Sequence, residues 1–250
     1  MTAMKLHRYP SPSGGVALGK MGCTDLFHRI TAKDYVQDGL VAMWDGIENA
    51  GWGVHNPNAI APVNLATGLT DSFSRENSSV SFTWGENFLS YSGGWIQFTN
   101  LNSAISTALQ TNYKTYQFVG DFQPTNASEW PPSADIWSQN GSNQCAFQYR
   151  QGTRLAYWDY NYASVDWDQY APTVVRDGNS FLYYDKGKFS RTTTGSNENY
   201  RPNISIRCGK ITSGTFKVHC IRLYSRALTA DEIARNYAID KARFNLPDIS

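Results

Sequence analysis

Two carboxylates, spaced two residues apart, are the first feature of this sequence that could do chemistry. Asp166 and Asp168 stand in the stretch SVDWDQY, and alternate residues of a β-strand point to the same face. Such a pair cleaves glycosidic bonds when one carboxyl group acts as nucleophile and the other as acid. The stretch offers no glutamate acid and no apolar pocket that would raise the pKa of one carboxyl group. We therefore favour a solvated strand face and predict no catalytic residue.

The same two aspartates are the candidate calcium ligands. Calcium takes about six to eight oxygen ligands, so loops would have to add others, for example from Asp159 or Asn161. Calcium stays an open alternative on this basis, and no other cofactor is expected. Four histidines show no spacing typical of metal ligands: His7, His28, His55 and His219.

The aromatic residues of the stretch AYWDYNYASVDWDQY give a better indication of binding. If its first half is one strand, the aromatic residues at 158, 160 and 162 share one face, with Asp159 and Asn161 on the other. A turn at Ala163–Ser164 would bring Trp167 back beside them. Aromatic rings stack on the apolar face of sugars, while amides and carboxylates bind hydroxyl groups. The candidate glycan-binding residues are Trp158, Tyr160, Tyr162, Trp167, Asp159 and Asn161. The alternative is that this face is simply core.

The composition favours a single β-domain with many turns. The 250 residues include 20 glycines and 10 prolines, 14% are aromatic and only 17% are charged, which suits a sheet protein better than a helical bundle. The net charge of +1 creates no strong field for nucleic acid or an anionic membrane. No apolar run is long enough to span a bilayer. Nucleic-acid partners and a membrane span are therefore not expected.

Short alternating segments separated by turn residues run from Asp38 onward. The stretch GLVAMWDG reads as a strand, SVSFTWGENFLSYSGGWIQFTN as two strands, and YKTYQFVGDFQP as one long strand. Hairpins are predicted at Gln151–Gly152, Asp177–Gly178 and Lys186–Gly187. The stretches NISIRCGK and FKVHCIRLY complete the set. This pattern predicts an all-β, antiparallel sandwich or jelly roll.

One helix is clearly signalled, close to the end of the chain. Thr229 and Glu232 have the spacing of a capping box, and acidic residues in the first turn suit the helix dipole. Ile233 and Tyr237 fall on one face, and Pro247 sets the end. We expect a short helix that covers an exposed edge or end of the core.

Residues 1–37 differ from the rest of the chain, because prolines and glycines interrupt every periodicity. The segment carries basic residues such as Lys5, Arg8 and Lys20 and by itself should be disordered. It has no continuous apolar core of a signal peptide. We interpret residues 1–37 as an irregular arm, which either folds back on its own domain or is held by neighbouring subunits of an assembly, and residues 38–250 as the folded domain.

The four cysteines, Cys23, Cys145, Cys208 and Cys220, lie far apart and match no zinc or redox spacing. Cys208 and Cys220 could pair across neighbouring strands. Without an export signal we favour buried or half-buried thiols.

Three stretches, DGLVAMWDG, FLYYDKGKF and GTFKVHCIRLYSRALTADEIARNY, together resemble the laminin-G-like, concanavalin A-like jelly-roll family. The similarity spans residues 38–246, and the closing stretch is its most specific part. Members of the family often carry a Tyr-x-Asp/Asn-Gly hairpin, and FLYYDKGKF has one additional residue before the glycine. The resemblance implies a jelly-roll β-sandwich with one C-terminal helix, in a family whose members mostly bind ligands.

Three functions follow, in this order of preference. The first is a non-enzymatic recognition or structural module of a virion, such as a capsid decoration, fibre or tail protein, with a lectin-like head for surface glycans. For this first function we expect that other subunits of an assembly bind the 1–37 arm, that the protein is a homo-oligomer and that it is located in the virion. The second is a free carbohydrate-binding module at a bacterial surface or outside the cell. The third is a glycoside hydrolase or lyase.

Overall fold

The fold is an antiparallel β-sandwich, as the sequence predicts. The structure is a computed structural model that describes residues 30–47, 63–70, 72–99, 103–111, 113–121, 134–138, 143–145, 147–150, 153–158, 161–164, 171–194, 204–211 and 216–246. Within these residues every paired strand is antiparallel, and the strands form four sheets.

The largest sheet has eight strands in the order β16-β15-β14-β8-β18-β6-β5, and β1 also pairs with β18. Its strands are β1 (Leu40–Asp45), β5 (Ser81–Trp84), β6 (Leu89–Ser92), β8 (Tyr113–Asp121), β14 (Pro172–Asp177), β15 (Ser180–Asp185), β16 (Lys188–Thr194) and β18 (Phe216–Tyr224). The predicted strand GLVAMWDG, the long strand at YKTYQFVGDFQP and the closing strand FKVHCIRLY are confirmed as β1, β8 and β18.

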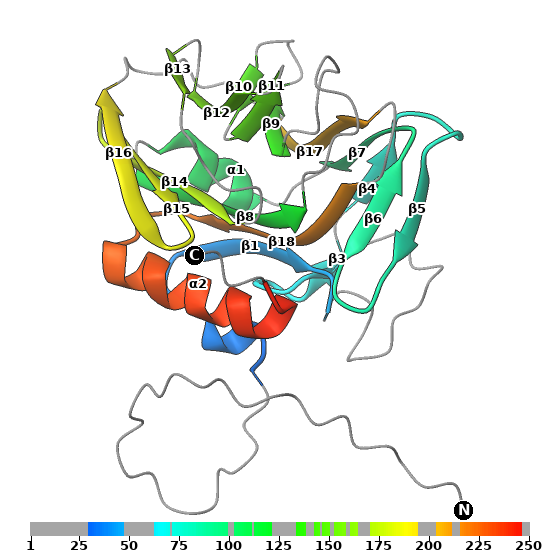
Figure 1. Ribbon diagram of the computed structural model, residues 1–250, viewed down its shortest axis with the longest axis horizontal. Helices are drawn as coiled ribbons and strands as arrows, with labels where there is room; N and C mark the ends of the chain where they lie inside the picture. Colours follow the sequence, from blue (N-terminus) through cyan, green and yellow to red (C-terminus); the bar gives the residue numbers. More distant parts are fainter. Residues whose placement is uncertain are drawn as a thin grey trace, which may run out of the picture.

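A second sheet of five strands lies over the first (Figure 1). It contains β4 (Ser72–Arg75), β7 (Gly94–Thr99), β9 (Ala134–Ser138), β10 (Asn143–Cys145) and β17 (Ile204–Ile211). A three-stranded sheet follows, with β11 (Phe147–Arg150), β12 (Thr153–Trp158) and β13 (Asn161–Ser164), and the smallest pairs β2 (Val63–Asn64) with β3 (Leu69–Thr70). The stretch SVSFTWGENFLSYSGGWIQFTN forms three strands, β5, β6 and β7, where we expected two.

Local turn chemistry accounts for the hairpins. The β15–β16 turn uses Lys186 and Gly187, both with positive φ, at 49° and 75°, which matches the right-handed twist of the flanking strands. β11 and β12 pair as a hairpin in which Arg150 lies opposite Thr153, and positions 151–152 themselves lie outside the described residues. Between β14 and β15, Asp177 pairs with Ser180 and Gly178 has a φ of 62°. All three predicted hairpins are confirmed.

In the described part of the chain, three helical segments accompany the sheets: η1 (Ala32–Asp34), α1 (Ser103–Gln110) and α2 (Ala230–Phe244). The sequence analysis did not predict α1. The capping box at the start of α2 is confirmed, since the Thr229 hydroxyl accepts from the Glu232 amide and the Glu232 carboxylate accepts from the Thr229 amide. Asn245 ends the helix in the left-handed conformation, a usual helix-terminating geometry.

Helix α2 covers a face of the eight-stranded sheet and not an edge or end, which corrects our expectation (Figure 1). We call this face the outer face and the opposite one the inner face. Ile233 is fully buried against residues of β14, β15 and β18, including Val175, Tyr184 and Tyr224. The predicted Ile233/Tyr237 stripe thus packs on the sheet, because its apolar side chains leave water there.

Residues just before Asp38 pack against the core of the domain. Ala32 and Tyr35 are buried in one cluster with Phe244 and Leu246. Val36 is buried beside Ile233. Residues 31–36 are therefore part of the core beneath α2, and residues 1–29 of the predicted arm lie outside the described residues.

Candidate functional site

The β12–β13 hairpin carries three of the predicted glycan-binding positions. Trp158 is the last residue of β12, and Asn161 and Tyr162 are the first two of β13. The register pairs Trp158 with Asn161 and Tyr157 with Tyr162. Asp159, Tyr160, Trp167 and the candidate calcium ligands Asp166 and Asp168 lie outside the described residues.

This register corrects the expected single strand. We expected residues 157–162 to run on in one strand and the chain to turn at Ala163–Ser164. The chain reverses instead between Trp158 and Asn161, so Asn161 lies directly opposite Trp158, and the two positions face the same side of the hairpin. Ala163 and Ser164 belong to β13. The sequence between Trp158 and Asn161 lacks the glycine that commonly marks a tight hairpin turn, so the reversal was not recognised.

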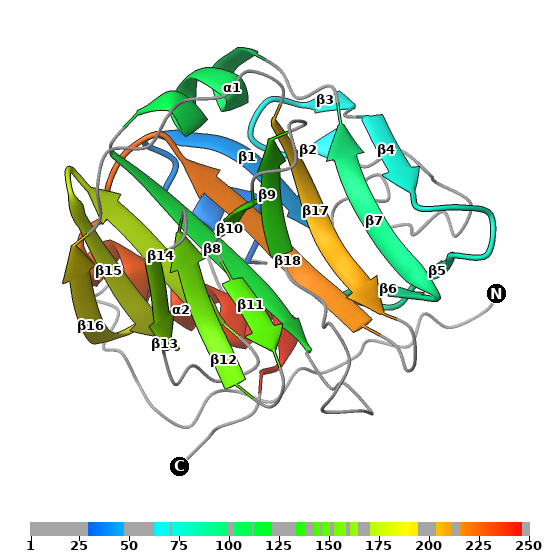
Figure 2. The same ribbon diagram turned by 90° about the horizontal axis from the view of Figure 1, so that it is seen from above.

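The three-stranded sheet is displayed on the inner-face side of the molecule. Figures 1 and 2 show β11, β12 and β13 over β8 and β14, on the side away from α2. The described chain begins and ends on the other side, since Ala32 and Leu246 share one apolar cluster beneath α2. The aromatic hairpin and the two ends of the described domain therefore lie on opposite sides of the eight-stranded sheet.

Two buried cations lie on the inner face below this hairpin. Lys114 and Arg176 are opposite each other in β8 and β14 and are each 1% exposed. The Arg176 Nε donates to the Gly178 carbonyl at 3.1 Å, and the guanidinium lies 5.5 Å from the Phe181 ring centre. The sequence analysis missed both residues. Their only signal in the sequence was one charged residue within each of two predicted strands. A charged residue in a strand is more typical of a face that is exposed to solvent.

Tyr183 extends the inner face onto β15. It is buried, and its hydroxyl lies 3.0 Å from that of Thr193 on β16. Burial raises the pKa of Tyr183, so the phenol stays neutral at ordinary pH. The residue acts as a packed hydrogen-bonding group of the sheet and not as an acid or base.

On the outer face, a buried ion pair joins α2 to the sheet. Arg222 of β18 binds Asp240 of α2 through two hydrogen bonds of 2.6 Å each. Tyr35 donates its hydroxyl to Asp240 at 2.7 Å, and its ring lies 4.2 Å from the Arg222 guanidinium. Burial works to lower the pKa of Arg222, but Asp240 and its other neighbours hold it well above its usual value. The Arg222 guanidinium therefore stays charged.

Amide side chains continue this buried network. Asn236 donates to Gln117 at 2.8 Å and to the Tyr224 hydroxyl at 2.9 Å, and it accepts from the Val36 amide at 3.0 Å. Gln117 also accepts from Arg222 at 3.0 Å. Helix, sheet and the segment before β1 are thus connected by satisfied polar contacts, and the arrangement stabilises the fold.

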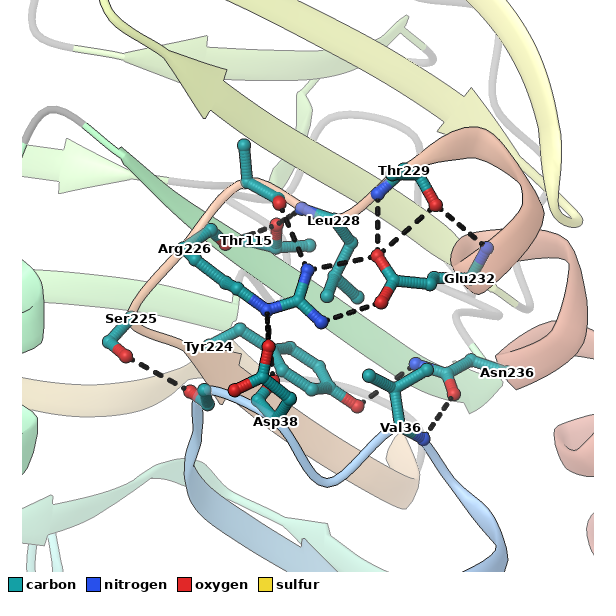
Figure 3. A network of polar contacts seen from close by, with 12 residues as sticks. Val36, Asp38, Thr115, Tyr224, Ser225, Arg226, Leu228, Thr229, Glu232 and Asn236 are labelled. Carbon is teal, nitrogen blue, oxygen red and sulfur yellow. Dashed lines mark hydrogen bonds and ion pairs between the residues drawn. The ribbon is translucent and has the colours of Figure 1, made fainter.

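A second, more exposed network surrounds the start of α2 (Figure 3). Arg226 donates two hydrogen bonds to Glu232, at 2.9 and 2.6 Å, and its Nε lies 2.8 Å from the Asp38 carboxylate. Thr115 of β8 accepts from the Leu228 amide at 2.9 Å. Both carboxylates of this network bind the same guanidinium, so they are held as a structural pair and not as an acid and a base.

This network predicts a specific response to acid. The hydrogen bonds from Arg226 are the main reason why the pKa of Glu232 falls from 4.5 to about 2. A lowered folded-state pKa stabilises the protein above the unfolded pKa, and the gain is lost as the pH falls from about 4.5 to about 2. We expect the stability difference between the wild type and Glu232→Gln to shrink across this window, as measured by urea denaturation at each pH. A difference that does not change with pH would contradict the assignment.

The remaining predictions concern a cysteine, a histidine, metal binding and a membrane span. Cys220 of β18 is a buried free thiol, as the sequence analysis favoured, and burial raises the pKa of this thiol. His219 is buried in β18, as expected of a packed strand residue, with Nδ1 3.0 Å from the Asn87 carbonyl. In the described part of the chain no group of three or more His, Cys, Asp or Glu residues could hold a metal ion. No helix there is long and apolar enough to cross a membrane.

Solved structures show what the fold resembles. Similar structures include the binding domain of botulinum neurotoxin serotype D, with a TM-score of 0.59 and 12% identity, covering 81% of this chain and 52% of that one. The receptor-binding domain of the botulinum neurotoxin C/D mosaic serotype matches with a TM-score of 0.57, 12% identity and the same coverage. The binding domain of botulinum neurotoxin DC in complex with SialylT matches with a TM-score of 0.56 and 12% identity, and the match covers 81% of this chain and 52% of that one.

These matches are consistent with a jelly-roll β-sandwich. The chain spans about half the length of each of these neighbours. No family model and no curated protein matches the sequence, so the laminin-G resemblance remains a prediction.

Proposed function

We propose that this protein is a non-catalytic recognition module that binds carbohydrate through the β12–β13 hairpin. The observation that carries the proposal is the position of that hairpin: β12 and β13 lie on the side of the eight-stranded sheet opposite α2, and their register pairs Trp158 with Asn161. Sugars bind where aromatic rings stack on their apolar faces and amides bind their hydroxyls. The similar structures support the proposal through their fold, since they are binding domains and one of them is a complex with SialylT.

The two-sided arrangement also suits a module held by one end. Residues 31–36 pack under α2, on the side of the sheet away from the hairpin. An anchor on one side and a ligand surface on the other leave both free to act at once.

Replacing Trp158 by alanine tests the carbohydrate proposal. We expect binding on an array of neutral and sialylated glycans to weaken at least about ten-fold, because a stacked aromatic contact contributes about that factor. Phe189→Ala is the matched control, since Phe189 is an exposed aromatic residue (56%) on β16. Unchanged binding of Trp158→Ala would exclude the hairpin as the site. A wild-type protein that binds no glycan on the array would overturn the proposed function.

The finer proposal is a virion-associated protein, in which residues 1–29 dock into neighbouring subunits of a capsid, fibre or tail. The basic and irregular character of that segment supports it. A free carbohydrate-binding module of a bacterial surface system is the alternative. The direct test is mass spectrometry of purified virus particles. The virion proposal requires that this protein is found in the particles, and the alternative requires that it is absent from them.

A further inference from the structure

We propose a second saccharide-binding surface, on the outer face at the end of the eight-stranded sheet away from the β15–β16 turn, and we infer that it takes neutral sugars. The register aligns four residues of adjacent strands in one row: Tyr113 pairs with Asp177, Asp177 with Ser180, and Ser180 with Thr194. Directly opposed residues of antiparallel strands lie on the same face. We call this set the Tyr113 row.

The Tyr113 row lies on the outer face, because alternate residues of β8 share a face and Thr115 contacts Leu228 just before α2. The helix leaves the row uncovered. Tyr113 is 54% exposed, Asp177 and Thr194 are exposed and Ser180 is half-buried. With strands about 4.8 Å apart, the row spans about 14 Å, which is room for a short oligosaccharide.

Tyr113 differs from the other strongly exposed aromatic residue of the described chain. Phe189 packs edge-on against Tyr184, with ring centres 5.6 Å apart, so packing explains its position. The Tyr113 hydroxyl has no hydrogen-bond partner among the described residues. A side chain at Gly178 would meet only this hydroxyl, at 3.9 Å, so the ring extends beside the β14–β15 turn with its surface open.

Hydrogen bonds hold the Tyr113 end of the row and the β14–β15 turn beside it. The Thr111 hydroxyl lies 2.7 Å from the Tyr113 carbonyl and 3.1 Å from that of Ala108, which joins the end of α1 to the start of β8. The Arg176 side chain donates to the Gly178 carbonyl at 3.1 Å and fixes the β14–β15 turn. Such a preformed surface loses little entropy when a ligand binds.

The charge of the Tyr113 row selects the ligand class. Asp177 supplies a carboxylate, which only accepts hydrogen bonds and therefore suits sugar hydroxyls. It also repels the carboxylate of an acidic sugar. Ser180 and Thr194 add hydroxyls that can donate or accept. An exposed ring, a carboxylate and two hydroxyls match a neutral saccharide, whose apolar face would stack on Tyr113.

This inference rests on the proposed carbohydrate function, and one experiment separates the two. The full-length protein, labelled with ¹⁵N, is titrated with lactose, maltose, chitobiose and, as the acidic probe, 3′-sialyllactose. We expect at least one neutral disaccharide to shift amide signals of the Tyr113 row. Tyr113→Ala and Asp177→Ala should each weaken that binding at least about ten-fold, whereas Phe189→Ala should leave it unchanged.

Each outcome decides between the proposals. Neutral binding lost in Tyr113→Ala and Asp177→Ala but kept in Trp158→Ala supports the Tyr113 row as a separate site. If binding of the neutral sugar is lost only in Trp158→Ala, the Tyr113 row is not a binding site and the proposed function still holds. Shifts at the row by 3′-sialyllactose alone contradict the neutral-sugar inference. If none of the four sugars shifts the row, the second surface is excluded, and the glycan array decides the proposed function by itself.

Discussion

Asp240→Ala is expected to lower the free energy of unfolding by about 3–5 kcal/mol, because breaking a buried ion pair leaves an uncompensated charge in the interior. The side chain of Arg222 is 0% exposed and that of Asp240 3%. The substitution removes both hydrogen bonds to Arg222 and the acceptor of the Tyr35 hydroxyl. A loss of this size is a large share of the total stability of a domain. Guanidinium denaturation followed by circular dichroism measures it.

Two further variants make this experiment decisive. Asp231→Ala changes an exposed aspartate in the first turn of the same helix and should cost less than about 1 kcal/mol, the usual dipole contribution. The double variant Arg222→Met with Asp240→Leu should be more stable than Asp240→Ala, because no charge then stays buried. Equal losses in Asp240→Ala and Asp231→Ala would show that the ion pair does not hold α2 on the sheet.

Ile233→Ala is the second large effect, with an expected loss of about 2–5 kcal/mol from the lost burial and the cavity that remains. Ile233 is 0% exposed and packs with residues from β14, β15, β18 and the segment before β1. The cavity would therefore open where four segments meet, and neighbouring side chains have little freedom to fill it.

Ile30→Ala provides a matched control for the same chemical change. Ile30 is 38% exposed, so its truncation should change the stability by no more than about 0.5 kcal/mol. The two variants are compared by the denaturation midpoint at equal m-value. Similar midpoints for both would mean that α2 contributes little to the core.

Much of the fold could be predicted because the relevant signals are local. The β15–β16 turn was predicted from Lys186–Gly187, and the α2 capping box from Thr229 and Glu232. Each depends on residues within four positions of one another, whose conformational preferences act before any tertiary contact forms. Alternation of apolar residues likewise marked β1, β8 and β18.

Local sequence signals did not predict those features that depend on strand register or on long-range contacts. The reversal between Trp158 and Asn161 depends on how β12 and β13 pair, and a run of alternating aromatic residues fits one strand as well as two. The short helix α1 has neither an acidic first turn nor a basic last turn, so its ends carry little dipole signal.

The sequence by itself determined the class of fold, the main hairpins and the capped helix, because these follow from periodicity, turn residues and capping within a few positions. Only the tertiary structure decided that α2 covers a sheet face and that Tyr35 meets Asp240 across 205 positions of sequence. The same holds for the Tyr113 row, whose four residues come from four strands. Strand order and register bring such residues together, and neither is encoded in any one segment of the chain.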